Sequence, residues 1–335
     1  MTEPVVLALD GNSLVHRSFH AQARTAQPAW AVRGLLTQLV AAVDRIRPAA
    51  VVIGFDDPDR SLRRERWPEY KAHRGDKLET LVEQLAQAVD VMRELGVAVL
   101  VPDGLEADDV VASAARFARD AAAQCVIVTS DRDAFALIDE TTRVLRIING
   151  GVDASPLMTA ERLVMLLGVQ PWQYRDYAAM RGDPSDNLVG VHGIGPRNGA
   201  RLLAEFGSAE AAFDDLDRVR EHFGAGLAAR LAHADARTAW QRNCEVMTAR
   251  DDLELDLNMR SGCGALPLDA QTVGRIFRQQ GLIWSVAEAV RVLADVDVED
   301  ERPPRPAPGW PVETWSPPRL PRLEPKPESH QLALF

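Results

Sequence analysis

Cysteine is scarce in this chain of 335 residues. The three cysteines, Cys125, Cys244 and Cys263, are odd in number, far apart in the sequence, and form no Cys-x-x-Cys pair. A disulfide framework needs paired cysteines, and a structural zinc site needs clustered ones. The sequence therefore argues against both and favours a reducing, cytoplasmic setting.

Long apolar runs and several catalytic motifs are also missing. No stretch is apolar enough to span a bilayer, and the chain begins Met1-Thr2-Glu3-Pro4 without a basic leader, so no membrane association is expected. There is no P-loop and no Gly-x-Ser-x-Gly motif, so an NTPase or a serine hydrolase has no support. The length suits one large domain or two smaller ones.

Positive charge is in deficit, because the formal net charge is −11. Taken alone, this deficit weighs against a nucleic-acid partner, since phosphates attract a basic surface. The objection weakens if many of the acids are gathered in a metal site, where bound cations reverse the local charge.

Acidic residues follow four apolar runs, at residues 5–9, 49–55, 97–101 and 125–129. Runs that are apolar throughout and separated by helical patterns predict a parallel sheet covered by helices on both faces. The carboxyl ends of such strands meet at one edge, where ligands bind. One acid there could be a turn residue or a helix cap, but four by accident are improbable. The acids are Asp10, Asp56, Asp57, Glu106, Asp108, Asp109, Asp131 and Asp133.

The most crowded acids are Glu106-Ala107-Asp108-Asp109 at an expected helix start. Like charges repel unless cations neutralise them, although a solvated helix start is an equal alternative for this stretch by itself. Asp183 and Asp186 add two more acids. Ligation by carboxylate oxygens alone selects Mg²⁺ or Mn²⁺, and two such ions roughly 4 Å apart can hydrolyse a phosphodiester.

Residues 60–74 form the most basic stretch and include Trp67 and Tyr70. Mixed cations and aromatics suit a nucleic-acid backbone and unstacked bases, although a solvated loop is the plain alternative. His16 and His20 have zinc-like spacing, but with no third ligand a packed or phosphate-facing pair is favoured. The glycine-rich run 191–203 predicts a hairpin entering a helix, where backbone N–H groups can bind phosphate.

The composition changes from residue 299, where prolines recur from Pro303 to Pro327. Such a segment predicts an extended linker. It ends in the apolar tip Gln331-Leu332-Ala333-Leu334-Phe335, which suits a peptide ligand.

Several motifs together resemble those of the structure-specific 5′-nucleases, or flap endonucleases. The chain is most similar to the 5′→3′ exonuclease domain of bacterial DNA polymerase I, over about residues 5–293. The motifs are Leu9-Asp10-Gly11-Asn12 with Arg17 and Phe19-His20-Ala21, Phe55-Asp56, Tyr70-Lys71-Ala72 with Arg74, Glu106-Ala107-Asp108-Asp109, Thr129-Ser130-Asp131-Arg132-Asp133, and Gly182-Asp183-Pro184-Ser185-Asp186-Asn187 running into Gly193-Ile194-Gly195.

The resemblance implies an α/β, PIN-like (resolvase-like) fold with a parallel sheet. It implies a nuclease domain at 1–181 with a helical arch at about 58–80. A helix–three-turn–helix and helical region would occupy 182–298, and residues 299–335 a disordered tail. His16 and Leu62 stand where relatives often carry aromatics, and Asn198-Gly199 replaces the usual Thr-Ala. With no polymerase region following, a stand-alone, monomeric, nucleoid-associated enzyme is expected.

The resemblance also implies residue roles, which are assigned by motif position. A first metal site would use Asp10, Asp56, Glu106, Asp108 and Asp109; Asp131 and Asp133 would lie between the sites; Asp183 and Asp186 would complete the second. Lys71 and Arg74 would be catalytic, contacting the scissile phosphate. DNA contacts would come from Arg17, Arg63, Tyr70, Gly193, Gly195, Arg197 and Arg201, and a K⁺ ion would lie near Val189, Val191 and Ile194.

The expected activity is a Mg²⁺- or Mn²⁺-dependent 5′→3′ exonuclease and flap endonuclease. Its substrates would be branched, nicked or gapped DNA, with RNA primers included, in replication and repair. The tail residues Gln331, Leu332, Leu334 and Phe335 resemble the pentapeptide that docks replication proteins on the DNA sliding clamp. Two alternatives are a catalytically silent DNA-junction binder recruited to the clamp and a PIN-like ribonuclease.

Overall fold

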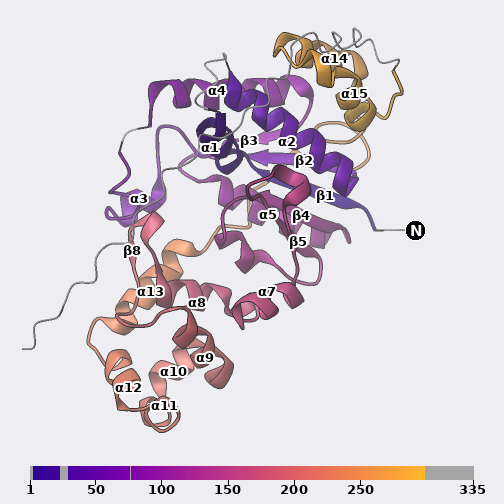
Figure 1. Ribbon diagram of the computed structural model, residues 1–335. Helices are drawn as coiled ribbons and strands as arrows, with labels where there is room; N and C mark the ends of the chain where they lie inside the picture. The colour runs from indigo at the N-terminus through magenta and orange to yellow at the C-terminus, as the bar shows by residue number, and fades with distance from the viewer. Residues whose placement is uncertain (1–2, 23–28, 76, 299–335) are drawn as a thin grey trace, which may run out of the picture. The chain divides into compact units, whose positions relative to one another are not determined.

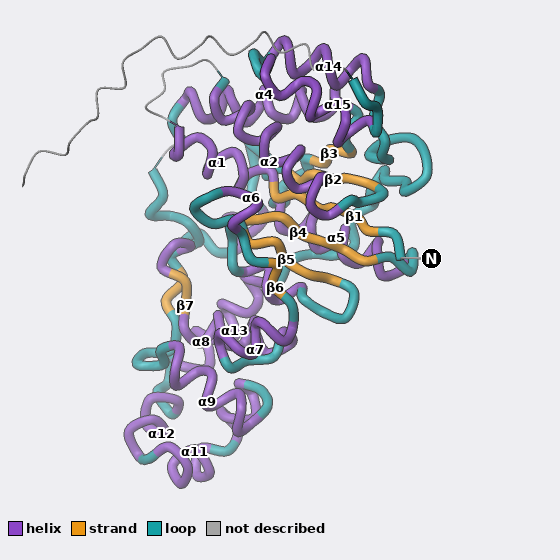
Figure 2. The backbone as a smooth tube through the Cα atoms, turned by 45° about the vertical axis from the view of Figure 1, so that its right-hand side comes forward, coloured by secondary structure: helices purple, strands orange, loops and turns teal. Residues whose placement is uncertain are grey.

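Six strands form the central sheet of this computed structural model, which describes residues 3–22, 29–75 and 77–298. The strand order is β3-β2-β1-β4-β5-β6, and all pairs are parallel except β5 with β6 (Figures 1 and 2). The expected parallel sheet is confirmed. The strands are β1 (Val5–Asp10), β2 (Ala50–Gly54), β3 (Ala98–Leu100), β4 (Gln124–Thr129), β5 (Thr142–Arg146) and β6 (Leu157–Met158).

The strand register brings the acid-bearing ends together. Asp10 pairs with Gly54 of β2, and its neighbour Leu9 pairs with Val128 of β4. Asp56 therefore lies two residues beyond β2, and Asp131 two residues beyond β4, on either side of Asp10. Because parallel strands end at one edge, these acids share it.

One face of the sheet is covered by helices from both ends of the described chain. These are α1 (Gly11–Gln22), α2 (Trp30–Ile46), α4 (Glu79–Leu95), α14 (Ala270–Gln279) and α15 (Val286–Ala294). Their apolar side chains, such as Leu36, Met92 and Phe277, are buried in one cluster with Leu7 and Ile53 of the sheet. The small helix α6 (Gly151–Ala154) contributes Val152.

The other face is covered by α5 (Ala107–Asp120), whose apolar stripe is alanine- and valine-rich and buried. The same core cluster continues from α5 into the helical region, through Tyr174 and Trp240. The core cluster therefore continues beyond residue 181, and the described residues up to 298 belong to one compact unit. The helices are α7 (Ala160–Leu167), α8 (Tyr174–Arg181), α9 (Pro196–Phe206), α10 (Ala209–Asp214), α11 (Leu216–Phe223), α12 (Ala225–Leu231) and α13 (Ala236–Met247), with short turns η1 (Asp133–Leu137), η2 (Pro171–Gln173) and η4 (Ile283–Ser285).

The basic stretch forms the short helix α3 (Leu62–Arg66) and a series of turns leading toward α4. Asp300–Phe335, which holds the expected clamp-binding peptide, lies outside the described residues. Among the helices that are described, none is long and apolar enough to cross a membrane.

A tight hairpin precedes α9. It consists of β7 (Gly182–Asp183), η3 (Pro184–Asp186) and β8 (Leu188–Val189). Gly182 has a positive φ of 77°, and a Cβ on Gly190 would lie 2.3 Å from the carbonyl carbon of Arg181. The hairpin can therefore close only because both positions lack a side chain.

Gly190→Ala should destabilise the fold by roughly 1–3 kcal/mol, since a methyl group would be forced against backbone that cannot move independently. Gly226→Ala is the matched control: this glycine lies in α12 with no atom within 4 Å of its Cβ position. Alanine there should be neutral or stabilise by up to about 1 kcal/mol. Chemical denaturation measures both; equal effects would contradict the close-packed hairpin.

Candidate active site

Asp10 ends β1 and is held from two sides. Its Oδ1 accepts a hydrogen bond from Ser13 N (2.9 Å) and its Oδ2 accepts one from Thr129 Oγ1 (2.7 Å). Burial raises the pKa of Asp10 to about 7, with Asp56 and Asp131 adding repulsion that the two hydrogen bonds only partly offset. The carboxylate is thus oriented but poorly neutralised.

Asp56 is oriented by a side chain on α1 and by the backbone at the start of α5. Its N–H donates to Asn12 Oδ1 (3.1 Å), and its Oδ1 accepts from Ala107 N at the start of α5 (3.0 Å). Burial raises the pKa of Asp56, and the charge of Glu106 raises it further. Asp56 therefore links the end of β2 to the acid-rich helix start.

Glu106 lies at the start of α5 and is buried, with 6% of its surface exposed. Its Oε2 accepts hydrogen bonds from Tyr70 Oη (3.0 Å) and Lys71 Nζ (3.2 Å). Burial alone would lower the pKa of Lys71, but Glu106 and Asp186 outweigh burial and raise it. Lys71 is consequently charged at neutral pH and faces the acids.

Asp108 is the acid with the fewest partners. Within the described part of the chain, its carboxylate makes no hydrogen bond or ion pair. Burial raises its pKa well above the ordinary value, and Asp10 and Asp131 raise it further. Its oxygens remain open to a ligand.

Four more acids lie toward the helical region. Asp131 Oδ1 accepts from Asp133 N (3.0 Å), and Asp183 Oδ1 accepts from Ser185 N (2.7 Å). Burial raises the pKa of Asp133 to about 8, and the charges of Asp131, Asp183 and Asp186 add to this shift. Burial also raises the pKa of Asp186, although the charges of Lys71 and Arg74 act to lower it.

A cavity of about 710 Å³ opens at this edge of the sheet. Its lining combines acids from three strand ends and α5 with cations from the basic stretch and α1. The functional lining residues are Asp10, Asp56, Asp108, Asp131, His16, Arg17, Lys71, Arg74 and Lys77. Arg17 Nη2 donates to Asn149 Oδ1 (3.0 Å), which keeps it at the rim.

The donor set fits a hard divalent cation. The acids supply only oxygen, several are buried with raised pKa values, and Asp108 has unfilled lone pairs. In the described ranges, no three Asp, Glu, His or Cys side chains form a complete metal cage by themselves. Mg²⁺ commonly takes one or two carboxylates and fills its other positions with water and substrate phosphate, so an incomplete cage suits it.

His16 and His20 do not form part of such a cage. Burial lowers the pKa of His16 to about 4, and the neighbouring cations Lys77, Arg74 and Lys71 contribute through repulsion. His16 is therefore neutral at pH 7, and it lines the cavity.

Much of the basic stretch is paired within the protein. Arg63 is nearly buried, with 11% of its side chain exposed, and Tyr70 is 3% exposed. The expectation that these two contact DNA is not met by their placement, because both side chains are engaged by Asp109 and Glu106. Arg74 instead reaches Asp186 (2.5 Å) and Ser185 O (3.1 Å), beside the acids.

Asp109 differs from the other expected metal ligands. It is fully buried, and its two oxygens accept a bidentate pair from Arg63 at 2.7 and 2.8 Å. The N–H groups of Arg250 and Glu106 donate to the same oxygens. The carboxylate therefore faces protein on every side.

The glycine hairpin places Gly193 and Gly195 before α9. Gly193 has a φ of 75°, and its carbonyl accepts from Arg230 Nη1 (3.0 Å). Arg197 is exposed at the first turn of α9, and Arg201 stacks over Phe223 (4.8 Å). Of the carbonyls expected to bind K⁺, Val189 O already accepts from Asn243 Nδ2 (3.0 Å) and Val191 O accepts from Ile194 N (3.0 Å).

Thr129, Ser13 and Asn12 form hydrogen bonds with the acids, although their motifs gave them no roles. Thr129 Oγ1 donates to Asp10 and accepts from Asp131 N (3.0 Å), so one hydroxyl joins two acids. Ser13 Oγ contacts Ser130 Oγ and accepts from Ser130 N. Their position directly beside motif acids in the sequence was the available signal.

Two family comparisons cover most of the chain. Residues 5–165 match the 5′-3′ exonuclease, N-terminal resolvase-like domain, and residues 169–268 match the 5′-3′ exonuclease, C-terminal SAM fold. The chain belongs to the 5′-3′ exonuclease family.

Its relatives in this family include much longer proteins. DNA polymerase I of Mycobacterium tuberculosis is 36% identical over 236 residues, which are 69% of this chain and 26% of that protein. The thermostable DNA polymerase I of Thermus aquaticus is 35% identical over 258 residues, 76% of this chain and 29% of that protein. The chain thus spans less than a third of the length of these relatives.

Solved structures confirm the fold of this 5′-3′ exonuclease family member. The T5 5′-exonuclease with bound divalent metal ions superposes with a TM-score of 0.60 at 17% identity, covering 85% of this chain and 99% of that one. The catalytic core of Rad2 with a DNA substrate has a TM-score of 0.56 at 17% identity, with coverages of 89% and 93%.

The raised pKa values predict how pH changes stability without metal. Asp10 and Asp133 titrate at about 7 and about 8 in the fold, but near pH 4 when unfolded. Between pH 4 and these folded pKa values, the folded state binds more protons than the unfolded state. The free energy of unfolding therefore falls as pH rises, by up to about 1.4 kcal/mol per pH unit for each of the two carboxyl groups. His16 acts oppositely, but only below about pH 6.5.

Thermal unfolding between about pH 6.5 and 8 isolates the carboxylate effect. We expect the metal-free Tm to fall across this window, and Mg²⁺ or Mn²⁺ to raise it more at the upper end. Asp10→Asn should reduce the dependence and leave the part that is due to Asp133. A metal-free Tm that is constant with pH would contradict this electrostatic description.

Proposed function

We propose that this protein is a divalent-metal-dependent 5′→3′ exonuclease and 5′-flap endonuclease. It hydrolyses phosphodiesters in branched, nicked or gapped DNA, RNA-primed ends included. The observation that carries the proposal is the single cavity in which Asp10, Asp56, Asp108 and Asp131 face Lys71 and Arg74. Acids for metal binding and cations for phosphate binding therefore lie at one place. A T5 flap endonuclease of the same fold has been solved with DNA and metal ions.

We assign the acids to two groups, of which Asp10, Asp56, Asp108 and Asp131 line this cavity. Asp10, Asp56, Glu106 and Asp108 would hold one Mg²⁺ or Mn²⁺ ion, and Asp131, Asp133, Asp183 and Asp186 would hold a second. When bound, such ions activate a water and stabilise the leaving oxygen of a phosphodiester. The raised pKa values support this assignment, because bound cations relieve the repulsion that causes them.

Lys71 and Arg74 would neutralise the phosphate under attack. Lys71 is oriented by Glu106 and by its ring contact with Tyr70, with Nζ 4.6 Å from the ring centroid. Arg74 is oriented by Asp186 and the carbonyl of Ser185. Cations fixed in advance cost no reorganisation when charge develops on the phosphate.

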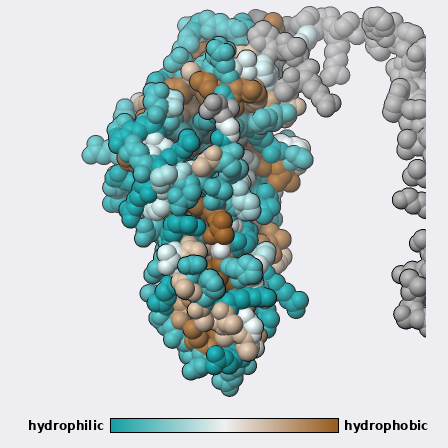
Figure 3. Space-filling view, turned by 90° about the vertical axis from the view of Figure 1, so that its left-hand side faces the viewer, coloured by the Kyte–Doolittle hydropathy of each residue, from teal (hydrophilic) through white to brown (hydrophobic). Residues whose placement is uncertain are grey.

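The hairpin and α9 would hold the duplex away from the cleavage site. Gly193 and Gly195 leave the backbone accessible before a helix N-terminus, which favours an anion, and the exposed Arg197 adds charge. A K⁺ ion near Val189, Val191 and Ile194 would add to this grip, with Val191 O and Ile194 O as its main ligands, because Val189 O already accepts from Asn243 Nδ2 and from Arg242 Nη2 (3.4 Å). The protein face shown in Figure 3 is largely hydrophilic with small apolar groups, which suits contact with a hydrated DNA backbone.

Asp108→Asn and Asp131→Asn should each lower the cleavage rate of a labelled 5′-flap by about 100-fold or more, the scale for losing one group that stabilises developing charge. Asp120→Asn is the matched control, because Asp120 is exposed at the far end of the same helix as Asp108. Gel assays with Mn²⁺ measure all three. Full activity in Asp108→Asn and Asp131→Asn would refute the assignment.

We also propose that the C-terminal peptide docks the enzyme on the DNA sliding clamp. The support is sequence alone: Gln331, Leu332, Leu334 and Phe335 end a proline-rich tether. Removing residues 331–335 should abolish clamp binding in surface plasmon resonance and leave flap cleavage without the clamp unchanged. Unaltered clamp affinity would rule this docking out.

A further inference from the structure

We infer that the buried Arg63–Asp109 ion pair is a positioning junction: it holds the arch-borne Lys71 over the metal site, and Asp109 serves as the partner of Arg63 instead of ligating a metal. The inference rests on the proposed nuclease function. It assigns a different role to one acid of the Glu106-Ala107-Asp108-Asp109 motif.

The hydrogen bonds of Asp109 leave no room for a metal ion. Its Oδ1 accepts from Arg63 Nη2 (2.7 Å) and Arg250 N (2.8 Å), and its Oδ2 accepts from Arg63 Nη1 (2.8 Å) and Glu106 N (2.9 Å). A carboxylate has about four lone-pair positions. All are filled by protein donors, whereas the neighbouring Asp108 has none filled by the residues described.

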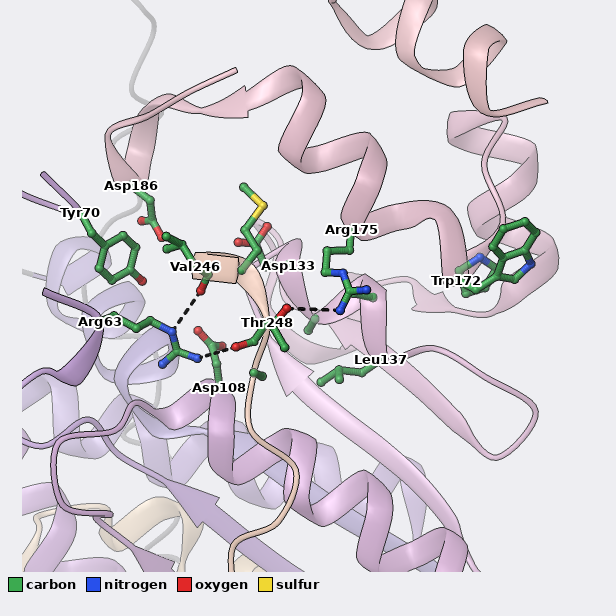
Figure 4. A pocket seen from close by; sticks show the side chains of 15 residues that line it. Arg63, Tyr70, Asp108, Asp133, Leu137, Trp172, Arg175, Asp186, Val246 and Thr248 are labelled. Carbon is green, nitrogen blue, oxygen red and sulfur yellow. Dashed lines mark hydrogen bonds between the residues drawn. The ribbon is translucent and has the colours of Figure 1, made fainter. Parts of the chain in front are cut away.

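Arg63 joins three parts of the chain. Besides Asp109, its Nε donates to Val246 O (3.1 Å) and its Nη2 to Thr248 O (3.3 Å), at the end of α13. In Figure 4, dashed lines join the guanidinium to these two carbonyls, and Asp108 and Tyr70 lie beside it. Arg63 thereby ties α3, at the base of the arch, to the start of α5 and to the helical region. A planar guanidinium can make this set of bonds, and an ammonium cannot.

On one side, the junction is connected to Lys71, the proposed catalytic cation. Tyr70 and Lys71 follow α3 by a few residues, and both donate to Glu106 Oε2. The N–H of Lys71 also donates to Asp186 O (2.9 Å). The base of the arch is fixed by Arg63, and Lys71 is fixed by its hydrogen bonds to Glu106 and Asp186. Lys71 is therefore held in a defined position beside the acids.

The junction is connected to the hairpin on the other side. Asn243 lies one turn before Val246 on α13 and is fully buried. Its Nδ2 donates to Ala179 O and Val189 O, on α8 and β8. A continuous set of hydrogen bonds, most of them buried or partly buried, therefore runs from the hairpin through α13 and Arg63 to the arch.

Asp109→Asn and Arg63→Lys test the junction, with Glu245→Gln as the matched control. Glu245 pairs with Arg66 (2.9 Å) and also joins α13 to α3, but that pair is largely exposed. The full chain is assayed for Mn²⁺ binding by calorimetry, and for kcat and KM on a labelled 5′-flap at saturating Mn²⁺. Amide hydrogen exchange over residues 62–74 is measured without DNA.

We expect both variants to bind as many Mn²⁺ ions as the parent with near-equal affinity. Their kcat should fall by about 10–100-fold while KM changes little, because a displacement near 1 Å is costly to catalysis. Amides of 62–74 should exchange faster in both variants, and Glu245→Gln should match the parent in every assay.

Three results would overturn the junction. One is loss of a Mn²⁺ ion, or affinity weakened by more than about tenfold, in Asp109→Asn. The second is recovery of kcat with excess Mn²⁺, which marks a ligand. The third is a kcat and an amide hydrogen exchange rate in Arg63→Lys that equal those of the parent. If Asp109→Asn does not fold, Arg63→Lys alone tests the junction. If the parent itself cleaves no flap, the proposed function fails, whereas exchange and Mn²⁺ binding still report on the junction.

Discussion

Mutual repulsion between buried carboxylates at the carboxyl edge of the sheet is the constraint on which the site depends. Burial first, and then like charge, raises the pKa of Asp10 to about 7 and that of Asp133 to about 8. The fold offsets this cost with fixed donors such as Thr129 and with the cation of Lys71, but only in part. The uncompensated remainder makes this edge electrostatically favourable for the divalent cations that the proposed function requires.

Adjacent acids differ in role because different groups donate hydrogen bonds to them, more than because of their positions in a motif. Asp108 and Asp109 are neighbours at the start of one helix, yet successive residues on a helix point in different directions. Asp108 faces the cavity without a donor, whereas Asp109 faces α3 and the end of α13. In the proposed enzyme, the same residue type would therefore bind metal at Asp108 and hold Arg63 at Asp109.

Basic residues show the same division. The stretch 60–74 looks like one cationic surface in the sequence, but Arg60, Arg63 and Arg66 each pair with an acid of the protein. Lys71 and Arg74 also have acidic partners, yet they line the cavity, where a phosphate can join them. Local sequence cannot distinguish these cases, because the acids that decide them lie up to 179 residues away in the chain.

The sequence by itself determined the parallel sheet, the gathering of acids at its edge and the glycine hairpin. These follow from short-range patterns: apolar runs that end in carboxylates, and glycines where backbones must touch. Only the tertiary structure decided which side chains remain open. Glu106 is shared by Tyr70 and Lys71, Asp109 is saturated by Arg63, and Asp108 is left free, because hydrogen-bond saturation depends on packing between segments that are distant in the chain.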